Sequence, residues 1–398
     1  MPHTLNIIDY LEWRADVPFD IAPFNPVDNL VLSQFSYMKM EGMAGKSLCE
    51  AARAIASAGT APDNDLRLCG LLAQSRRFAD ARILRCEERL DEHIEMQFAA
   101  AVIELGDGTA CVVFRGTDST LVGWKEDLNM SFADEVPSQA AAVRFLNESI
   151  YHTRLPLRVM GHSKGGNLAV YSSALCLPDV QSSIIAVYNN DGPGLIDSVM
   201  DSPGYEHIEA RVNTYLPQSS VIGMLLNHPE SYQVIHADGS LGILQHDPYA
   251  WETRRDHFNC EGGLRRGSLY TDRAIKDWVK DIPNEKRKEF IDAVYAVLQA
   301  THARTLNDLS ASWGRSAMAI LAAMSKLEPE TRHHIHAVIG ALISACAKNI
   351  RIFPQQDAEK PRIQDASDAE SALPEGELPS DIADGADAEG EVPPPTHA

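Results

Sequence analysis

The sequence predicts an α/β protein in which helices flank a mostly parallel sheet, and two observations lead to this fold class. Apolar runs of strand length alternate with segments of helical periodicity between residues 96 and 236, a pattern typical of parallel sheets covered on both faces. The 398-residue chain is also 44% hydrophobic and 23% charged, which is the composition of a globular protein with ample material for a core.

The first 92 residues are predicted to be helical. Residues 6–13 indicate a short helix, and residues 27–37 indicate an amphipathic helix after a turn that contains Pro23 and Pro26. Residues 45–92 are rich in Ala, Leu, Arg and Glu, and we interpret them as further helices.

The pattern changes at residue 96, where two apolar runs joined by Gly106-Asp-Gly108 predict a β-hairpin over residues 96–105 and 109–114. Apolar residues at helical spacing then predict a helix around residues 136–150. The elements expected beyond it are strands over 155–160, 183–188, 211–216 and 232–236, and a helix over 164–177.

The C-terminal part differs in composition from the rest. The pattern is helical from about residue 270 to 350, and residues 355–398 hold twelve acidic but two basic residues and no aromatic residue. Such a tail buries too little apolar surface to fold, so we expect it to be disordered. The predicted organisation is an α/β domain over 1–270 with a helical part over 1–92, a C-terminal helical region over 271–353, and an acidic tail over 354–398.

The net charge of −21 bears on the partners. Phosphate binding requires basic patches, so we expect neither nucleic-acid binding nor adsorption to anionic membranes. The N-terminus lacks the basic and apolar regions of a signal peptide, and no window approaches 18 uninterrupted apolar residues. The seven cysteines include no Cys-x-x-Cys pair, which favours free thiols and a cytoplasmic location.

The most informative stretch is Gly161-His-Ser163-Lys-Gly165, a Gly-x-Ser-x-Gly pattern between a predicted strand and a predicted helix. A sharp strand-to-helix turn strains the serine backbone and lifts its hydroxyl above the sheet, and the two glycines allow strand and helix to approach closely. The helix N-terminus favours negative charge on a substrate oxygen. Ser163 is therefore the predicted nucleophile. The alternative is a glycine-rich turn whose serine caps the helix.

A second motif, Phe114-Arg-Gly-Thr117 followed by Trp124-Lys-Glu-Asp127-Leu, lies upstream. A strand that ends in a turn of small residues can present a backbone N–H opposite the nucleophile, and the residue after the serine supplies the second N–H. We expect the N–H groups of Thr117 and Lys164 to form an oxyanion hole, with the Lys164 side chain pointing to solvent.

Together these motifs resemble the fungal-type (class 3) lipases of the α/β-hydrolase superfamily. In those enzymes the residue after Arg-Gly belongs to the oxyanion hole and the serine after Gly-His is the nucleophile. Asn189-Asn-Asp-Gly-Pro-Gly and Gln245-His-Asp-Pro-Tyr-Ala-Trp are closer still to the bacterial Mbeg-like family, a lipase-like family known mainly as a domain of unknown function. The resemblance spans about residues 5–260 and implies an α/β-hydrolase fold.

His246 is the predicted general base. In α/β-hydrolases the order along the chain is serine, acid, histidine, and His246 follows Ser163 in a loop beyond a predicted strand, where Pro248 and two aromatic residues would hold and shield it. It also matches the late histidine of the lipase-like families. His228 and His236 are the alternatives.

The predicted acid is Asp191. The stretch that matches the acid of fungal-type lipases, residues 215–223, contains no carboxylate. Asp191 instead ends the strand after the nucleophile helix, at the carboxyl edge of the sheet where α/β sites assemble, and some vertebrate-type lipases are similar in this placement. The alternatives are Ser219 or Ser220, which could orient the imidazole by a hydrogen bond, and Asp247, the neighbour of the predicted base.

The sequence thus predicts a serine hydrolase of esterase or lipase type that needs no metal or cofactor. Its substrate would be a small molecule with an ester, thioester or amide acyl group that is cleaved through an acyl-enzyme, and lipid-like molecules are among the candidates. The histidines of residues 331–336 lack a Cys or acid cluster at ligand spacing. Residues 195–210 or the C-terminal helices are lid candidates. The alternative functions are an inactive binding or scaffold protein with this fold and an acyltransferase.

Overall fold

The computed structural model describes residues 4–118, 120–130, 133–220, 222–224, 226, 228, 230–239, 242–264 and 284–301. Contacts divide the chain into Met1–Ile352 and Phe353–Ala398, and all of the described residues belong to the first unit. The predicted acidic tail and most of the predicted C-terminal helical region, including the histidines of residues 331–336, lie outside the described residues. The domain boundary at residue 270 stays a prediction.

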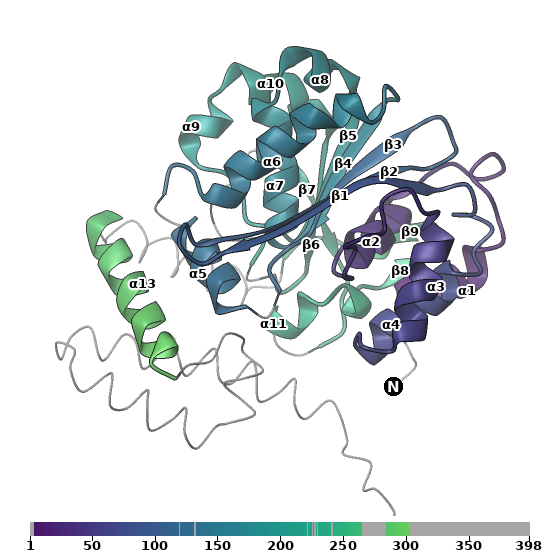
Figure 1. Ribbon diagram of the computed structural model, residues 1–398, viewed down its shortest axis with the longest axis horizontal. Helices are drawn as coiled ribbons and strands as arrows, with labels where there is room; N and C mark the ends of the chain where they lie inside the picture. Colours follow the sequence, from purple (N-terminus) through teal and green to yellow (C-terminus); the bar gives the residue numbers. More distant parts are fainter. Residues whose placement is uncertain are drawn as a thin grey trace, which may run out of the picture. The chain divides into compact units, whose positions relative to one another are not determined.

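A mostly parallel sheet confirms the predicted α/β fold (Figure 1). In the described residues it has eight strands in the order β1-β2-β3-β4-β5-β6-β7-β10, parallel from β3 to β7 and antiparallel elsewhere. The strands are β1 (Arg82–Asp91), β2 (Met96–Glu104), β3 (Ala110–Phe114), β4 (Leu157–His162), β5 (Ile184–Asn190), β6 (Val212–Pro217), β7 (Tyr232–Ile235) and β10 (Cys260–Glu261), with β8 (Thr253–Arg254) and β9 (His257–Phe258) as a separate pair.

Helices cover both faces of the sheet, and β3 shows how the two cores divide. Because successive side chains of a strand point to opposite faces, Cys111 and Val113 pack in the core with α1–α4, while Val112 and Phe114 pack in the core with α6 and α7. The helices are α1 (Ile7–Arg14), α2 (Pro26–Phe35), α3 (Leu48–Ala58), α4 (Asp63–Leu72), α5 (Leu121–Asn129), α6 (Pro137–Glu148), α7 (Lys164–Leu175), α8 (Pro178–Ser183), α9 (Asp197–Met200), α10 (Pro203–Ile208), α11 (Gly242–Gln245) and α13 (Asn284–Gln299).

Capping boxes begin the N-terminal helices. The side chains of Asn6, Asn25 and Ser47 each accept a hydrogen bond from the first turn, and the backbone N–H of each cap residue donates to an acidic side chain three residues later. Such reciprocal bonds satisfy N–H groups that a helix leaves open at its start. The helices predicted over residues 6–13 and 27–37 are confirmed as α1 and α2.

Residues 82–91 correct the sequence prediction, which assigned helix to all of 45–92. They form β1, at the end of the sheet order, paired with β2. The residues that favour a helix here are charged, and charged side chains also suit an edge strand because they discourage further strand pairing. Arg85 of this strand forms ion pairs with Glu87 and Glu148.

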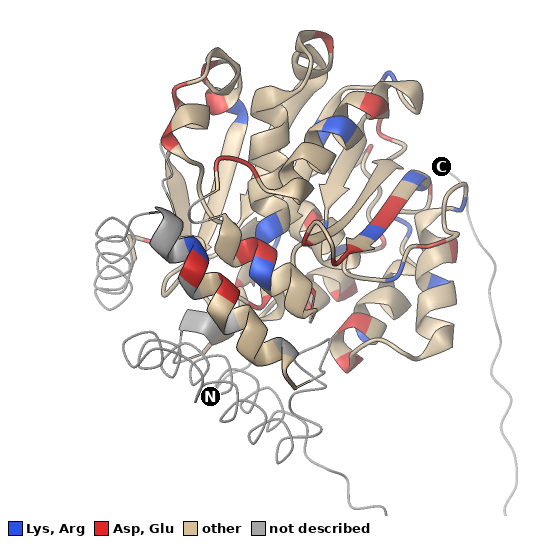
Figure 2. Cartoon of the chain, turned by 60° about the vertical axis from the view of Figure 1, so that its left-hand side comes forward, with Lys and Arg blue, Asp and Glu red and all other residues tan. Residues whose placement is uncertain are grey.

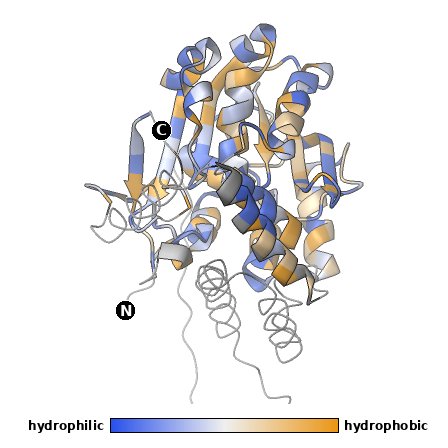
Figure 3. Cartoon of the chain, turned by 90° about the vertical axis from the view of Figure 1, so that its left-hand side faces the viewer, coloured by the Kyte–Doolittle hydropathy of each residue, from blue (hydrophilic) through white to orange (hydrophobic). Residues whose placement is uncertain are grey.

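Acidic and basic residues are interspersed over the helices and strands (Figure 2). Helix α13 combines hydrophilic and hydrophobic residues (Figure 3), with Ile291 and Leu298 buried and Lys288 exposed. Asp292 of α13 lies 2.8 Å from the ammonium of Lys125 on α5. None of the described helices has the length and apolarity needed to cross a membrane.

The lid candidate of residues 195–210 contains α9 and α10. Leu195, Tyr205 and Ile208 are buried in the core that also contains α7, and the Tyr205 hydroxyl donates a hydrogen bond of 2.8 Å to Glu230. The segment is therefore anchored on the body of the domain, which argues against its moving as a lid.

Candidate active site

Ser163 occupies a strained turn between β4 and α7. Its φ of 58° and ψ of −134° are rarely adopted by a residue with a side chain. A Cβ atom on Gly161 would lie 2.2 Å from the carbonyl of Gly165, and one on Gly165 would lie 2.2 Å from the carbonyl oxygen of Phe114. The glycines are thus required by the close approach of strand and helix, which is the geometry of a nucleophile elbow.

The loop after β3 lies against this elbow because β3 and β4 are parallel neighbours. A Cβ atom on Gly116 would lie 3.0 Å from the Cβ of Ser163. Among the described residues, the N–H groups of Thr117 and Lys164 donate no hydrogen bond. Both predicted oxyanion donors are therefore available beside the serine, and their role stays a prediction.

Asp191 and His246 meet although 55 residues separate them. His246 Nδ1 lies 2.6 Å from Oδ2 of Asp191, whose side chain is fully buried. Because a carboxylate only accepts hydrogen bonds, Nδ1 carries the proton and Nε2 presents its lone pair. Within the described part of the chain, Nε2 has no hydrogen-bond partner, and 20% of the His246 side chain is exposed.

The buried carboxylate of Asp191 has further partners in the loop after β6. Its Oδ1 accepts hydrogen bonds from the Ser220 hydroxyl at 2.5 Å and from the Gly223 N–H at 3.2 Å. A Cβ atom on Gly223 would lie 2.3 Å from that oxygen, so this position requires glycine. Residues 215–223, which contain no carboxylate of their own, thus hold the carboxylate of Asp191, which follows the neighbouring strand β5. In the sequence, the run Ser219-Ser220 was the signal that pointed to this contact.

His162 links the elbow to His246. Its Nε2 lies 2.8 Å from the backbone carbonyl of His246, and the two rings are 4.6 Å apart. The Tyr37 hydroxyl lies 3.0 Å from Nδ1. The carbonyl requires a proton on Nε2, so Nδ1 accepts from Tyr37. Burial and the neighbouring His246 hold the pKa of His162 well below its usual value, and the ring stays neutral. Tyr37, which follows α2, was not among the residues predicted from the sequence.

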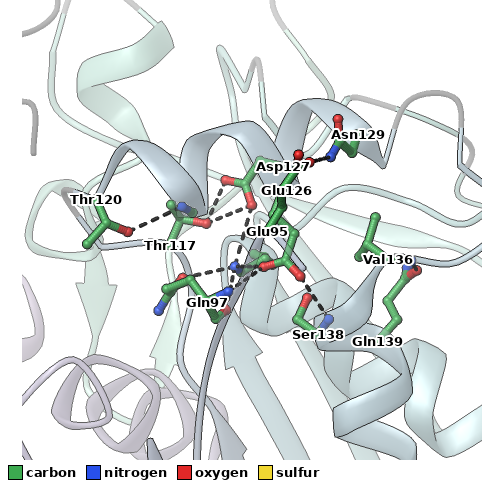
Figure 4. Close-up of polar contacts among 12 residues, drawn as sticks. Glu95, Gln97, Thr117, Thr120, Glu126, Asp127, Asn129, Val136, Ser138 and Gln139 are labelled. Carbon is green, nitrogen blue, oxygen red and sulfur yellow. Dashed lines mark hydrogen bonds and ion pairs between the residues drawn. The ribbon is translucent and has the colours of Figure 1, made fainter. Parts of the chain in front are cut away.

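The Lys164 side chain corrects a second prediction, because it is buried with 1% exposed instead of solvated. Its ammonium donates to the backbone and side-chain oxygens of Gln97 at 2.8 and 2.9 Å, and to Glu126 Oε2 at 2.8 Å. Figure 4 shows Gln97 and Glu126 side by side, with Thr117 and Asp127 beside them. Glu126 also accepts from the N–H of Ser138 at 2.8 Å, so it joins α5, α6 and the elbow.

The alternative candidates lie in other environments. Asp247 caps a short turn by accepting from the N–H of Tyr249 at 3.0 Å, and the backbone N–H of Ser219 donates to Gln245. His236 lies 2.8 Å from Glu252, and His228 lies 3.1 Å from Glu230. Among the described residues, no three His, Cys, Asp or Glu side chains gather as metal ligands would.

Comparisons with known proteins give distant structural likenesses and a family. Lipase II from Rhizopus niveus is 13% identical, with 57% of this chain and 88% of that chain covered at a TM-score of 0.32. A fungal lipase is 12% identical, with 61% and 87% covered at 0.38, and a Rhizomucor miehei lipase propeptide complex is 16% identical, with 61% and 74% covered at 0.34. No curated protein sequence matches.

The Mbeg1-like family matches residues 72–296, which is more than half of the 398 residues. The chain therefore belongs to the Mbeg1-like family, as the resemblance of its motifs indicated.

Proposed function

We propose that the protein is a serine hydrolase that cleaves a carboxylic ester, or a related thioester or amide, through an acyl-enzyme. The observation that carries the proposal is the contact of 2.6 Å between His246 Nδ1 and the buried Asp191. It leaves Nε2 without a partner among the described residues, on a ring whose centroid lies 4.6 Å from that of His162, the residue before Ser163 in the elbow. A base held in one tautomer next to a strained serine is the arrangement that activates a hydroxyl nucleophile.

In this mechanism the Ser163 hydroxyl oxygen attacks the acyl carbon while His246 Nε2 takes its proton. Asp191 stabilises the resulting imidazolium. The N–H groups of Thr117 and Lys164 bind the carbonyl oxygen as it becomes negative. His246 then gives the proton to the leaving group, which departs and leaves an ester on Ser163. Water hydrolyses that ester by the same steps, with His246 again as the base.

The inactive binding protein is the weaker alternative. It was favoured by the absence of a carboxylate from residues 215–223. The hydrogen bonds from Ser220 and Gly223 to Asp191 remove that support, because this stretch holds an acid that another strand supplies. Acyl transfer uses the same acyl-enzyme and differs only in the acceptor that attacks it.

Turnover of p-nitrophenyl esters of increasing chain length tests the proposal. We expect an initial burst of p-nitrophenol stoichiometric with protein, or steady release, that disappears in Ser163→Ala. Addition of an alcohol or amine then separates transfer from hydrolysis by its products. Folded wild-type protein that releases no p-nitrophenol from any ester or thioester, and behaves like Ser163→Ala, would refute the hydrolase.

A further inference from the structure

The ammonium of Lys164 is saturated with hydrogen bonds. Lysine has three N–H donors, and two oxygens of Gln97 and one of Glu126 take them at 2.8 to 2.9 Å. These bonds join β2, α5 and the first residue of α7. A cation at a helix N-terminus is unfavourable for the helix dipole, and burial adds a desolvation cost. Glu126, fully buried itself, offsets both.

The charge of Lys164 reaches further than its hydrogen bonds. Asp127 Oδ1 lies 3.8 Å from the ammonium, beyond hydrogen-bond distance, so the attraction between them is electrostatic. The pKa of Asp127 is raised to about 6, because burial outweighs Lys164 and the hydrogen bond from Thr117, which both act to lower it. The nearby Glu126 raises this pKa and His246 lowers it. The charge of Asp127 in turn contributes to raising the pKa of the Tyr37 hydroxyl. The cation of Lys164 therefore favours the carboxylate form of Asp127.

Asp127 in turn holds the side chain of Thr117, in the loop after β3. The Thr117 hydroxyl donates to both of its carboxylate oxygens, at 2.7 and 2.6 Å. Figure 4 shows this contact next to Glu126 and Gln97. A hydroxyl held on a carboxylate restricts the orientations open to its threonine, and the Thr117 N–H is a predicted oxyanion donor.

We propose that the side chain of Lys164 is a positioning residue for the oxyanion hole, whose buried charge holds Asp127 as a carboxylate and so fixes Thr117. The inference rests on the proposed hydrolase function. It gives Lys164 two separate roles. Its backbone N–H would contact the oxyanion, and its side chain would position the Thr117 N–H through Asp127.

A double-mutant cycle on the full chain separates this role from a merely structural one. The readout is the rate at which a fluorophosphonate probe labels the protein, compared for Lys164→Met, Thr117→Val and the double variant. We expect Lys164→Met to lower the rate about tenfold, less than the roughly 10²- to 10³-fold cost of deleting an oxyanion donor. In the Thr117→Val background, where no hydroxyl remains to be held, the same change should cost at most about twofold.

The controls address charge and folding. Lys125 is also buried and paired, with Glu95 at 2.6 Å, so Lys125→Met should leave the labelling rate unchanged. Met at position 164 leaves Glu126 as an unpaired buried carboxylate, so the cycle is repeated in a Glu126→Gln background if the single variant does not fold. Lys164→Arg, which keeps the charge, should restore most of the rate lost in Lys164→Met.

Two outcomes would overturn the inference in different ways. If wild-type protein labels at Ser163 but Lys164→Met lowers the rate by the same factor in both backgrounds, the hydrolase stands and the role of Lys164 through Thr117 is wrong. If folded wild-type protein does not label at all, the proposed function fails and this inference fails with it.

Discussion

Two histidine–carboxylate pairs contact Gly223 in the loop after β6, and they differ in whether a ring nitrogen is left without a partner among the described residues. His246 binds Asp191 through Nδ1, and its Nε2 has no partner among the described residues. His228 binds Glu230 through Nδ1, while its Nε2 contacts the carbonyl oxygen of Gly223. The side chain of His228 is 5% exposed, against 20% for His246.

The difference separates the proposed base from a structural histidine. Both ring nitrogens of His228 are in contact with acceptor oxygens, so neither is left for proton transfer. Burial raises the pKa of Glu230, but hydrogen bonds from His228 and Thr214 outweigh it and lower this pKa to about 2. His228 thus fastens the loop whose Gly223 N–H binds Asp191, whereas Nε2 of His246 is available for the proposed proton transfer.

The largest expected effect contrasts the two histidines directly. His246→Gln should lower the rate of fluorophosphonate labelling by about 10⁴-fold or more, because no base remains to take the serine proton. His228→Gln should lower it by less than about tenfold, since it loosens only the support of Asp191. Labelling rates measured side by side check this. Equal losses in the two variants would mean that the roles are not divided as described.

The acid of the first pair comes next. Asp191→Asn should lower the labelling rate roughly 10³- to 10⁴-fold, because an amide stabilises the imidazolium poorly and permits the wrong tautomer. Asp201→Asn is the matched control. Asp201 also follows β5 along the chain but is exposed, so this variant should label like wild type. If Asp191→Asn labels like its control, another group orients His246, and Ser220 becomes the first candidate.

Glu230 of the second pair should affect stability more than rate. Its folded pKa of about 2 lies below the usual 4.5, so its stabilising contribution is present above pH 4.5 and is lost as the pH falls toward 2. Glu230→Gln should lower the free energy of unfolding by roughly 2 to 3 kcal/mol at pH 7. Denaturant unfolding at pH 7 and pH 3.5 should show a smaller difference at the acidic pH. A difference independent of pH would contradict the assignment.

Ser220 should give the smallest effect. Ser220→Ala removes one hydrogen bond to the buried carboxylate of Asp191, which we expect to lower the labelling rate about three- to tenfold and the stability by about 1 kcal/mol. Ser219→Ala is the control, because the bond that Ser219 makes to Gln245 comes from its backbone N–H and survives the change. Identical rates for both variants would show that Ser220 does not support the acid.

The parts of the fold that the sequence predicted are those where local pattern and tertiary structure agree. The hairpin of β2 and β3, the parallel strands β4 to β7 and the elbow at Ser163 follow from periodicity and turn chemistry. The strand β1 was missed, because Arg and Glu favour a helix by propensity but are also used on exposed edge strands, where they discourage further pairing.

Within the candidate site, sequence reasoning reached residues that end strands and missed residues that act from neighbouring elements. Asp191 could be proposed because it ends β5. Tyr37, Gly223 and the buried side chain of Lys164 could not, because each depends on which element lies beside the elbow in space. Burial of Lys164 in particular requires Glu126, which is 38 residues away along the chain.

The most direct test of the account is to map where a fluorophosphonate probe attaches to the full-length protein. Intact-mass and peptide mass spectrometry should find one adduct per chain, on Ser163, and none in Ser163→Ala. The adduct should form far more slowly in His246→Gln. An adduct on another residue, or labelling of Ser163 that is as fast without His246, would contradict the claim that the Asp191–His246 pair activates this serine.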